Sequence, residues 1–289
     1  MVHFLKKKLK YMPVEFKEIS SYWNDRHPGR KIAGSLSEDT NPLEFFKMID
    51  TYRFDKNHYR YLLDGSFFNH SEFKAKKILE VGCGLGADLQ KFKEAGADVY
   101  AIDAAESAGH TLKKRFALIN ENFEFKAADF RYVPFEDESF DLFYSFGVLH
   151  HSPWISDGLK EAARVLKPGG ELIIMLYHKG FKYYIKKLFF RGIIQGGFIR
   201  KSKQELLNKY TEEFGESPTT LVFSKGEAIN LIDDMFDVVD TKVFRLDDNI
   251  NLPIFGKIYF FRALLPKFIY KKLGQLFGWN LMIRAKKKS

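Results

Sequence analysis

The chain has very little cysteine and no long apolar run. A single cysteine, Cys83, in 289 residues excludes a disulfide framework and any metal site built from several cysteines, and we predict no metal site. No apolar stretch reaches the ~18 residues that a membrane-spanning helix needs. The lysines near the N-terminus are not followed by the apolar core of a signal peptide. We therefore expect a cytoplasmic protein, and the basic segments described next leave peripheral contact with a membrane open.

Acidic residues are absent from two long segments. Residues 179–203 hold eight Lys or Arg and residues 257–289 hold nine, with no Asp or Glu in either. These 17 cationic residues exceed the net charge of +9, so the rest of the chain is net negative. The apolar fraction of 45% supports a full core and argues against disorder. The uneven charge predicts an acidic core with two basic appendages.

The most specific pattern present is a short apolar strand that runs into a glycine-rich turn. Residues 77–86 carry both, and a second strand ends at Asp103, about twenty residues after the first glycine. This pattern is typical of folds that bind an adenosine-bearing cofactor at the strand ends. Glycines let the backbone approach a ligand where a Cβ would clash. The turn alone does not decide which cofactor binds, because Gly82-x-Gly84-x-x-Ala87 also fits the motif of folds that bind a nicotinamide dinucleotide.

Three later blocks decide between these cofactors. Residues 128–130 follow a third predicted strand, residues 139–145 form a fourth, and residues 164–172 combine a helix end, a Pro-Gly turn and the start of a fifth. In this order the blocks resemble the class I S-adenosylmethionine-dependent methyltransferases, closest to the small-molecule branch that includes quinone and natural-product methyltransferases. The resemblance is strong over residues 77–178. It implies a doubly wound α/β fold with a seven-stranded, mostly parallel, Rossmann-like sheet, whose last strand at 279–285 inserts antiparallel beside the fifth.

The resemblance implies S-adenosylmethionine as the cofactor and a set of residues around it. Glu80 would reach its amino group, Asp103 the ribose hydroxyls and Asp129 the adenine amino group. For both aspartates the alternative is an ordinary acid in a strand-end turn, and for Cys83 we expect a small residue that fits a tight loop. The remaining positions that we assign to the cofactor are Gly82, Cys83, Gly84, Gly86, Ala104, Phe130, Phe146, Gly147 and, from the lid described next, Arg53.

The region before the core is expected to form a helical lid. Residues 1–70 make up this region, and Asn41-Pro42-Leu43-Glu44 predicts the start of a helix. The alternative is a packed helix with a surface arginine. The side chains that are candidates for closing over the cofactor are Trp23, Tyr52, Arg53 and Tyr59.

Residues 71–289 are expected to form the methyltransferase domain, with insertions at 179–224 and 249–278. Both insertions are rich in aromatic residues and lysine. They could form a cap that binds the acceptor, lie on an anionic membrane surface, or be core helices with solvated lysines. We favour the cap, and expect the insertions to pack together over the C-terminal edge of the sheet and to line the acceptor pocket.

The loop after the fourth strand carries paired histidines, His150 and His151. This loop faces the acceptor in the family, and either histidine is a candidate general base because imidazole exchanges a proton near neutral pH. The alternative is that the pair only shapes the loop. The loop lacks the Asn/Asp-Pro-Pro-aromatic motif of enzymes that methylate base amino groups, which disfavours a nucleic-acid acceptor.

The sequence predicts an enzyme that moves a methyl group from S-adenosylmethionine to a small organic acceptor by in-line displacement. The alternatives are a lipid-like, quinone-type acceptor at a membrane surface, a nicotinamide-dependent oxidoreductase on a similar sheet, and a non-catalytic protein that has kept the fold. The sequence does not indicate the acceptor or the oligomeric state.

Overall fold

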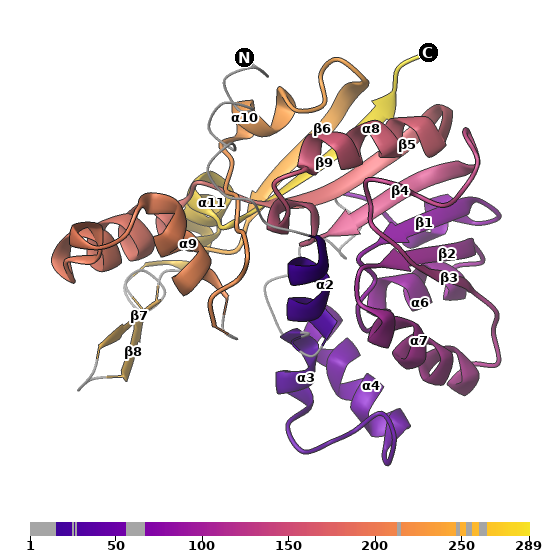
Figure 1. The fold of residues 1–289 in the computed structure, drawn as a ribbon, viewed down its shortest axis with the longest axis horizontal. Helices are drawn as coiled ribbons and strands as arrows, with labels where there is room; N and C mark the ends of the chain where they lie inside the picture. Colours follow the sequence, from indigo (N-terminus) through magenta and orange to yellow (C-terminus); the bar gives the residue numbers. More distant parts are fainter. Residues whose placement is uncertain are drawn as a thin grey trace.

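A seven-stranded sheet forms the centre of the molecule, with helices on both of its faces (Figure 1). The computed structural model describes residues 16–24, 26, 28–55, 67–212, 215–246, 249–252, 256–259 and 265–289. The strand order is β3-β2-β1-β4-β5-β9-β6. The strands are β1 (Lys77–Val81), β2 (Asp98–Asp103), β3 (Glu124–Ala127), β4 (Phe140–Phe146), β5 (Leu166–Tyr177), β6 (Phe236–Phe244) and β9 (Asn280–Lys287).

The pairing confirms the predicted topology. Strands β1 to β5 pair in parallel, and β9 lies antiparallel between β5 and β6, so that Ile283 is opposite both Ile174 and Thr241. The helices that accompany the sheet are α6 (Ala87–Glu94), α7 (Glu106–Leu118), α8 (Ile155–Val165) and α10 (Lys225–Ile229). This is the doubly wound, Rossmann-like arrangement that the sequence predicted.

Apolar side chains cover both faces of the sheet because successive residues of a strand point to opposite sides. In β1, Leu79 joins a core cluster with Leu159 of α8, whereas Ile78 joins a second cluster with Leu89 of α6 and Leu112 of α7. All five side chains are fully buried. Each such burial stabilises the fold by roughly 1.5–3 kcal/mol. The continuous apolar character of β1 therefore reflects a strand buried on both faces.

The N-terminal helices lie beside the carboxyl ends of the strands. They are α2 (Phe16–Asn24), α3 (Pro28–Ala33), α4 (Pro42–Asp50) and the turn η1 (Thr51–Asp55). Phe45 and Ile49 of α4 pack with Leu85 of the glycine turn. Helix α4 begins at Pro42 as predicted, but the side chain of Asn41 makes no capping hydrogen bond.

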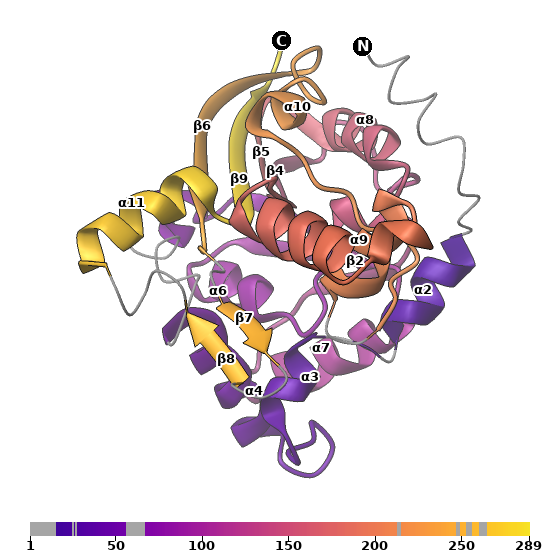
Figure 2. The ribbon, with the colours of Figure 1, turned by 90° about the vertical axis from the view of Figure 1, so that its left-hand side faces the viewer.

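The first insertion forms a helical hairpin that projects from the sheet (Figures 1 and 2). It contains η4 (Lys182–Ile194), η5 (Gly197–Ile199) and α9 (Lys203–Thr211). At its root, buried Tyr183 and Leu207 pack with Trp279, which precedes β9. The hairpin is thereby fixed to the carboxyl side of the sheet.

The second insertion contributes β7 (Asn249–Leu252), β8 (Gly256–Tyr259) and α11 (Lys267–Phe277). The two insertions meet where they leave the sheet, because a Cβ at Gly180 would lie 2.2 Å from the carbonyl oxygens of Phe277 and Gly278. Farther out, η4 packs mainly on α9, and α11 mainly on β6. No helix among the described residues is both long and apolar enough to cross a bilayer.

Candidate functional site

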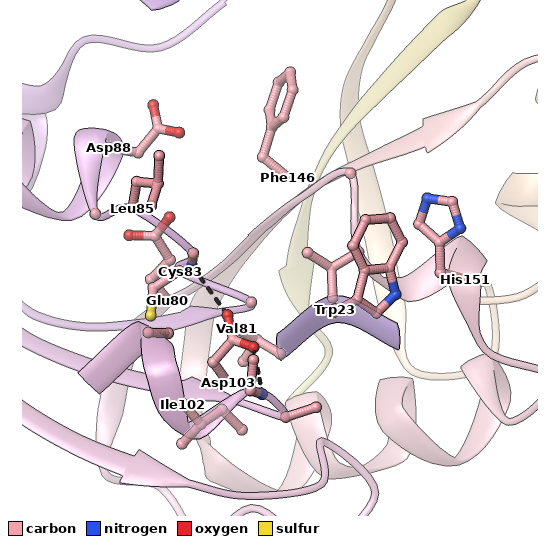
Figure 3. Close-up of a pocket in the computed structure, with 18 of the residues that line it drawn as sticks. Trp23, Glu80, Val81, Cys83, Leu85, Asp88, Ile102, Asp103, Phe146 and His151 are labelled. Carbon is pink, nitrogen blue, oxygen red and sulfur yellow. Dashed lines mark hydrogen bonds between the residues drawn. The ribbon is translucent and has the colours of Figure 1, made fainter. Parts of the chain in front are cut away.

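A pocket of about 290 Å³ opens beyond the carboxyl ends of β1, β2 and β4. Tyr52 and Arg53 of the N-terminal region also line the pocket. So does Trp23, which lies across the pocket from Glu80 (Figure 3). All positions that the sequence assigned to the cofactor lie around this one pocket: Arg53, Glu80, Gly82, Cys83, Gly84, Gly86, Asp103, Ala104, Asp129, Phe130, Phe146 and Gly147. The lid candidate Tyr59 lies outside the described residues.

The glycine turn brings bare backbone to the pocket wall. Gly82 and Gly86 have φ values of +76° and +73°, in the left-handed region that favours glycine. A Cβ at Gly82 would lie 2.2 Å from the side chain of Val148 in the loop after β4. The turn and that loop can therefore approach each other only because position 82 is glycine. The cradle fits a cofactor that lies against backbone.

Asp103 ends β2 with its carboxylate held by backbone N–H groups. The N–H of Gly84 donates to Oδ2 over 3.0 Å, and that of Ala105 donates to Oδ1 over 2.9 Å. Burial raises the pKa of Asp103, and these backbone donors act in the opposite direction. The acid is thus positioned before any ligand arrives, with lone pairs left to accept from two hydroxyls.

A second acidic group lies at the end of β1. Glu80 and Asp88 face one end of the pocket, opposite Trp23 and His151 (Figure 3). Glu80 is buried and its Oε2 accepts no hydrogen bond from the described residues. Burial, then repulsion from Asp88, raises its pKa well above the usual range, whereas Arg53 acts in the opposite direction. A buried carboxylate oxygen without a donor fits a ligand ammonium group at this point.

Arg53 connects the lid to this acidic end. Its guanidinium donates to Asp88 Oδ2 over 2.6 Å and lies 3.8 Å from the centroid of the Phe146 ring. Asp88 is in the first turn of α6, directly after the glycine turn. The lid arginine therefore contacts both the glycine-turn helix and the end of β4.

Replacing Glu80 by Gln tests this assignment with two opposed effects. The raised pKa means that folding favours the protonated acid, so its contribution to stability is present at low pH and is lost as pH rises through the folded pKa. At neutral pH the variant should be more stable without ligand by about 1–3 kcal/mol. Its affinity for S-adenosylhomocysteine should fall about tenfold or more, because the ammonium loses a charged partner. Thermal unfolding and calorimetric titration measure the two effects, and a destabilised variant with unchanged affinity would contradict the assignment.

Asp129 is less available than the sequence suggested. Its Oδ1 accepts from the backbone N–H of Arg131 and its Oδ2 from Nε of the same residue, over 2.9 and 2.8 Å. The Arg131 guanidinium lies 3.8 Å from the centroid of the Trp154 ring. Asp129 therefore shapes one side of the pocket while it holds Arg131.

Cys83 is buried, and burial followed by the charges of Asp103 and Glu80 raises the pKa of its thiol well above the usual value. A thiol in this state is a poor nucleophile. The structure thus places Cys83 as a small residue of a tight loop.

Helix α2 lines the pocket and is tied to the end of β2. Ser20 Oγ donates to the carbonyl oxygen of Ala104 over 2.7 Å, and Ser107 Oγ donates to that of Asn24 over 2.8 Å. Trp23 then contacts His151, with ring centroids 4.8 Å apart. Helix α2 and the loop after β4 therefore meet across the pocket.

The structure separates the two histidines. His151 lines the pocket, whereas His150 is fully buried behind the wall, with its ring centroid 3.8 Å from that of Tyr177. Burial and the neighbouring His151 lower the pKa of His150 well below its usual value. Only His151 is placed to exchange a proton with a molecule in the pocket.

His151 is held in one tautomer by its neighbours. Nδ1 lies 3.2 Å from the carbonyl oxygen of Thr219, which can only accept, so Nδ1 carries the proton and Nε2 is the basic nitrogen. Nε2 lies 3.7 Å from Oε1 of Glu212, which accepts from the hydroxyl of Tyr177 over 3.0 Å. Burial lowers the pKa of His151, and the Glu212 carboxylate raises it.

Several pocket residues were not expected from the sequence. Asp88 could have been found, because it is an acid in the first turn after the glycines. Tyr177, Glu212 and Arg245 come from separate segments and carried no local signal. Glu212 is the residue of the first insertion that lines the pocket. The helices of that insertion, expected to line the acceptor pocket, contribute no lining residue among 182–211, because they fold into a hairpin that packs on itself.

Comparison with known proteins agrees with the fold. Residues 79–174 match the family described as a methyltransferase domain. The chain is 34% identical over 98 residues to a sterol 4-C-methyltransferase of Caenorhabditis elegans, covering 33% of this chain and 29% of that protein. It is 29% identical over 112 residues to a ubiquinone biosynthesis O-methyltransferase of Coxiella burnetii, covering 39% and 48%. These matches span less than half of the relatives' own lengths, and they do not favour the nicotinamide alternative.

Solved structures extend the likeness over most of the chain. A protein of Pyrococcus horikoshii aligns with a TM-score of 0.51 at 18% identity, covering 86% of this chain and 94% of that one. An S-adenosylmethionine-dependent methyltransferase of Mesorhizobium loti aligns with a TM-score of 0.51 at 16% identity, covering 74% and 92%. At these identities the likeness supports the fold.

Proposed function

Because the centre of this chain is a class I S-adenosylmethionine-dependent methyltransferase domain, we propose that the protein transfers a methyl group from S-adenosylmethionine to a small organic acceptor. The observation that carries the proposal is that the two ends of the pocket carry different groups. Glu80 and Asp103 lie at the glycine turn, and His151 and Trp23 lie across the pocket from Glu80 (Figure 3). One pocket thus offers an end for the cofactor and an end for the acceptor.

The cofactor end is defined by residues that fit each part of the ligand. Glu80 would hold the amino group, the backbone of the glycine turn would lie under the methionine and ribose parts, and Asp103 would accept from the ribose hydroxyls. When bound, S-adenosylmethionine supplies a methyl group on a positively charged sulfur. The contribution of the protein is alignment and exclusion of water, and alignment can lower a barrier by roughly 7–11 kcal/mol.

The acceptor end combines aromatic walls with one basic nitrogen. Trp23 and Tyr177 line the pocket beside His151, and His151 Nε2 would take a proton from an acceptor that must lose one. Glu212 would stabilise the imidazolium that forms. The aromatic walls, and relatives named for sterol and ubiquinone methylation, support an acceptor with an apolar body.

Calorimetric titration of the purified protein tests the proposal directly. S-adenosylhomocysteine should bind in the micromolar range or tighter, because the buried acids and the glycine cradle match its parts. NADH should neither bind nor compete. Binding of NADH without binding of S-adenosylhomocysteine would overturn the proposed function.

A further inference from the structure

The tip of the helical hairpin exposes a dense group of large apolar side chains. Isolated apolar side chains on a surface are ordinary, whereas a contiguous group indicates a binding surface. The end of η4 folds onto η5 here, since a Cβ at Gly192 would lie 2.2 Å from the Phe198 ring. The exposed side chains, hereafter the tip cluster, are Phe189 (44%), Ile193 (62%), Ile194 (61%), Phe198 (43%) and Ile199 (85%).

The tip cluster lies in strongly basic surroundings. Residues 179–203 contain eight Lys or Arg and no acid. Arg191 and Arg200 are exposed beside the cluster. The next acid along the chain is Glu205, and its carboxylate accepts from the backbone N–H of Ser202 at the start of α9 over 2.6 Å. A surface that is both apolar and cationic complements an anionic lipid headgroup layer above hydrocarbon.

We propose that the tip cluster docks onto the surface of an anionic lipid bilayer. The apolar side chains enter the boundary between headgroups and acyl chains, and Arg191 and Arg200 lie among the headgroup phosphates. Each apolar side chain that leaves water favours binding in proportion to its buried area. The basic residues add an attraction that salt screens.

The root of the hairpin packs against a residue that lines the pocket. Tyr183 and Leu207 pack with Trp279 and with Tyr177, and Tyr177 lines the pocket. Figure 2 shows the hairpin in front of the carboxyl side of the sheet. Docking at the tip would hold the pocket near a layer in which an acceptor with an apolar body is concentrated. The docking itself does not depend on methyl transfer.

Sedimentation with lipid vesicles tests the docking. The full chain should bind to vesicles of phosphatidylcholine mixed with phosphatidylglycerol. It should bind much less to vesicles of phosphatidylcholine alone. The double variant Ile193→Asp/Ile199→Asp should lower the partition coefficient at least ~10-fold, because two apolar groups become anionic. Its affinity for S-adenosylhomocysteine should be unchanged. Leu118→Asp, at a 43% exposed position of α7, is the matched control and should bind like the unaltered protein.

The salt dependence of binding and a test of self-association distinguish an anionic bilayer from other occupants of the tip cluster. Raising the ionic strength from about 0.1 to about 1 M shortens the screening length from ~10 to ~3 Å, so binding to anionic vesicles should fall. Equal binding to neutral vesicles, or binding that the double variant keeps, would overturn the proposal. It would also be overturned if vesicles do not bind and sedimentation velocity shows a dimer that the double variant loses, which would make a second copy the occupant.

Discussion

Replacing Asp103 by alanine is expected to lower the affinity for S-adenosylhomocysteine at least ~100-fold, because the ribose loses two hydrogen bonds to a carboxylate, each worth about 1.5–3 kcal/mol. The loss extends to the turn itself. In the structure the same carboxylate accepts from the N–H groups of Gly84 and Ala105, so its removal also frees the backbone that cradles the ligand. Calorimetric titration measures the affinity, and circular dichroism checks the fold.

Two controls separate the ribose contact from general damage. Asp98→Ala removes an exposed acid at the start of the same strand, whose carboxylate accepts from the nearby Tyr100 hydroxyl, and should leave the affinity unchanged. Asp129→Ala should have a smaller effect than Asp103→Ala, because both of its oxygens already accept from Arg131. A folded Asp103→Ala protein with unaltered affinity would remove Asp103 from the site.

Replacing His151 by glutamine is expected to lower turnover about 10²–10⁴-fold for an acceptor that must lose a proton, with little change in cofactor affinity. The reason is that Nε2 of His151 is the basic nitrogen that the structure places at the acceptor end of the pocket. Rates measured with saturating cofactor report the effect. Near-normal turnover would mean that alignment alone carries the reaction and that the histidine only shapes the loop.

The pH profile distinguishes a base from a structural residue. A base must be neutral, so the rate falls as pH drops through the pKa of His151, which burial lowers from its usual value of about 6.5. The Glu212 carboxylate raises that pKa. In Glu212→Gln the pKa should fall further, and the acid limb of kcat/KM should move to lower pH. An acid limb that stays in place in a folded variant would contradict the coupling.

The sheet could be predicted from the sequence because local patterns determine it. The strand that runs into Gly82 and the acid at Asp103 each fix a short segment, and the order of the segments fixes the topology. The Pro-Gly pair at 168–169, predicted as a turn before the fifth strand, lies within β5 where its pairing with β4 shifts register. The same local signals brought the predicted cofactor residues to one pocket. Helix α10 also begins at a local signal, because the side chain of Ser224 accepts from the N–H of Glu227.

The acceptor side could not be predicted because it depends on tertiary packing. Glu212 reaches His151 only after the hairpin 182–211 folds back and Tyr177 provides a hydroxyl, and no spacing in the sequence encodes this meeting. The difference between His150 and His151 has the same origin. The two residues are adjacent in sequence and belong to one short turn, η3 (Leu149–His151). This turn places His150 behind the pocket wall and His151 at the surface of the pocket.

The position of β9 has a consequence for how the chain folds. Strand β5 pairs with β9 from Glu171↔Lys286 to Tyr177↔Asn280, and residues 178–279 lie between the two strands. During synthesis β5 is complete long before its partner leaves the ribosome, so one edge of an apolar strand stays unpaired meanwhile. Such an edge is a template for pairing with other chains, and closing contacts of large sequence separation is slow. The free edge of β5 and the attachment of β6 therefore wait for β9, and substitutions that weaken β9 should favour aggregation of newly made chains.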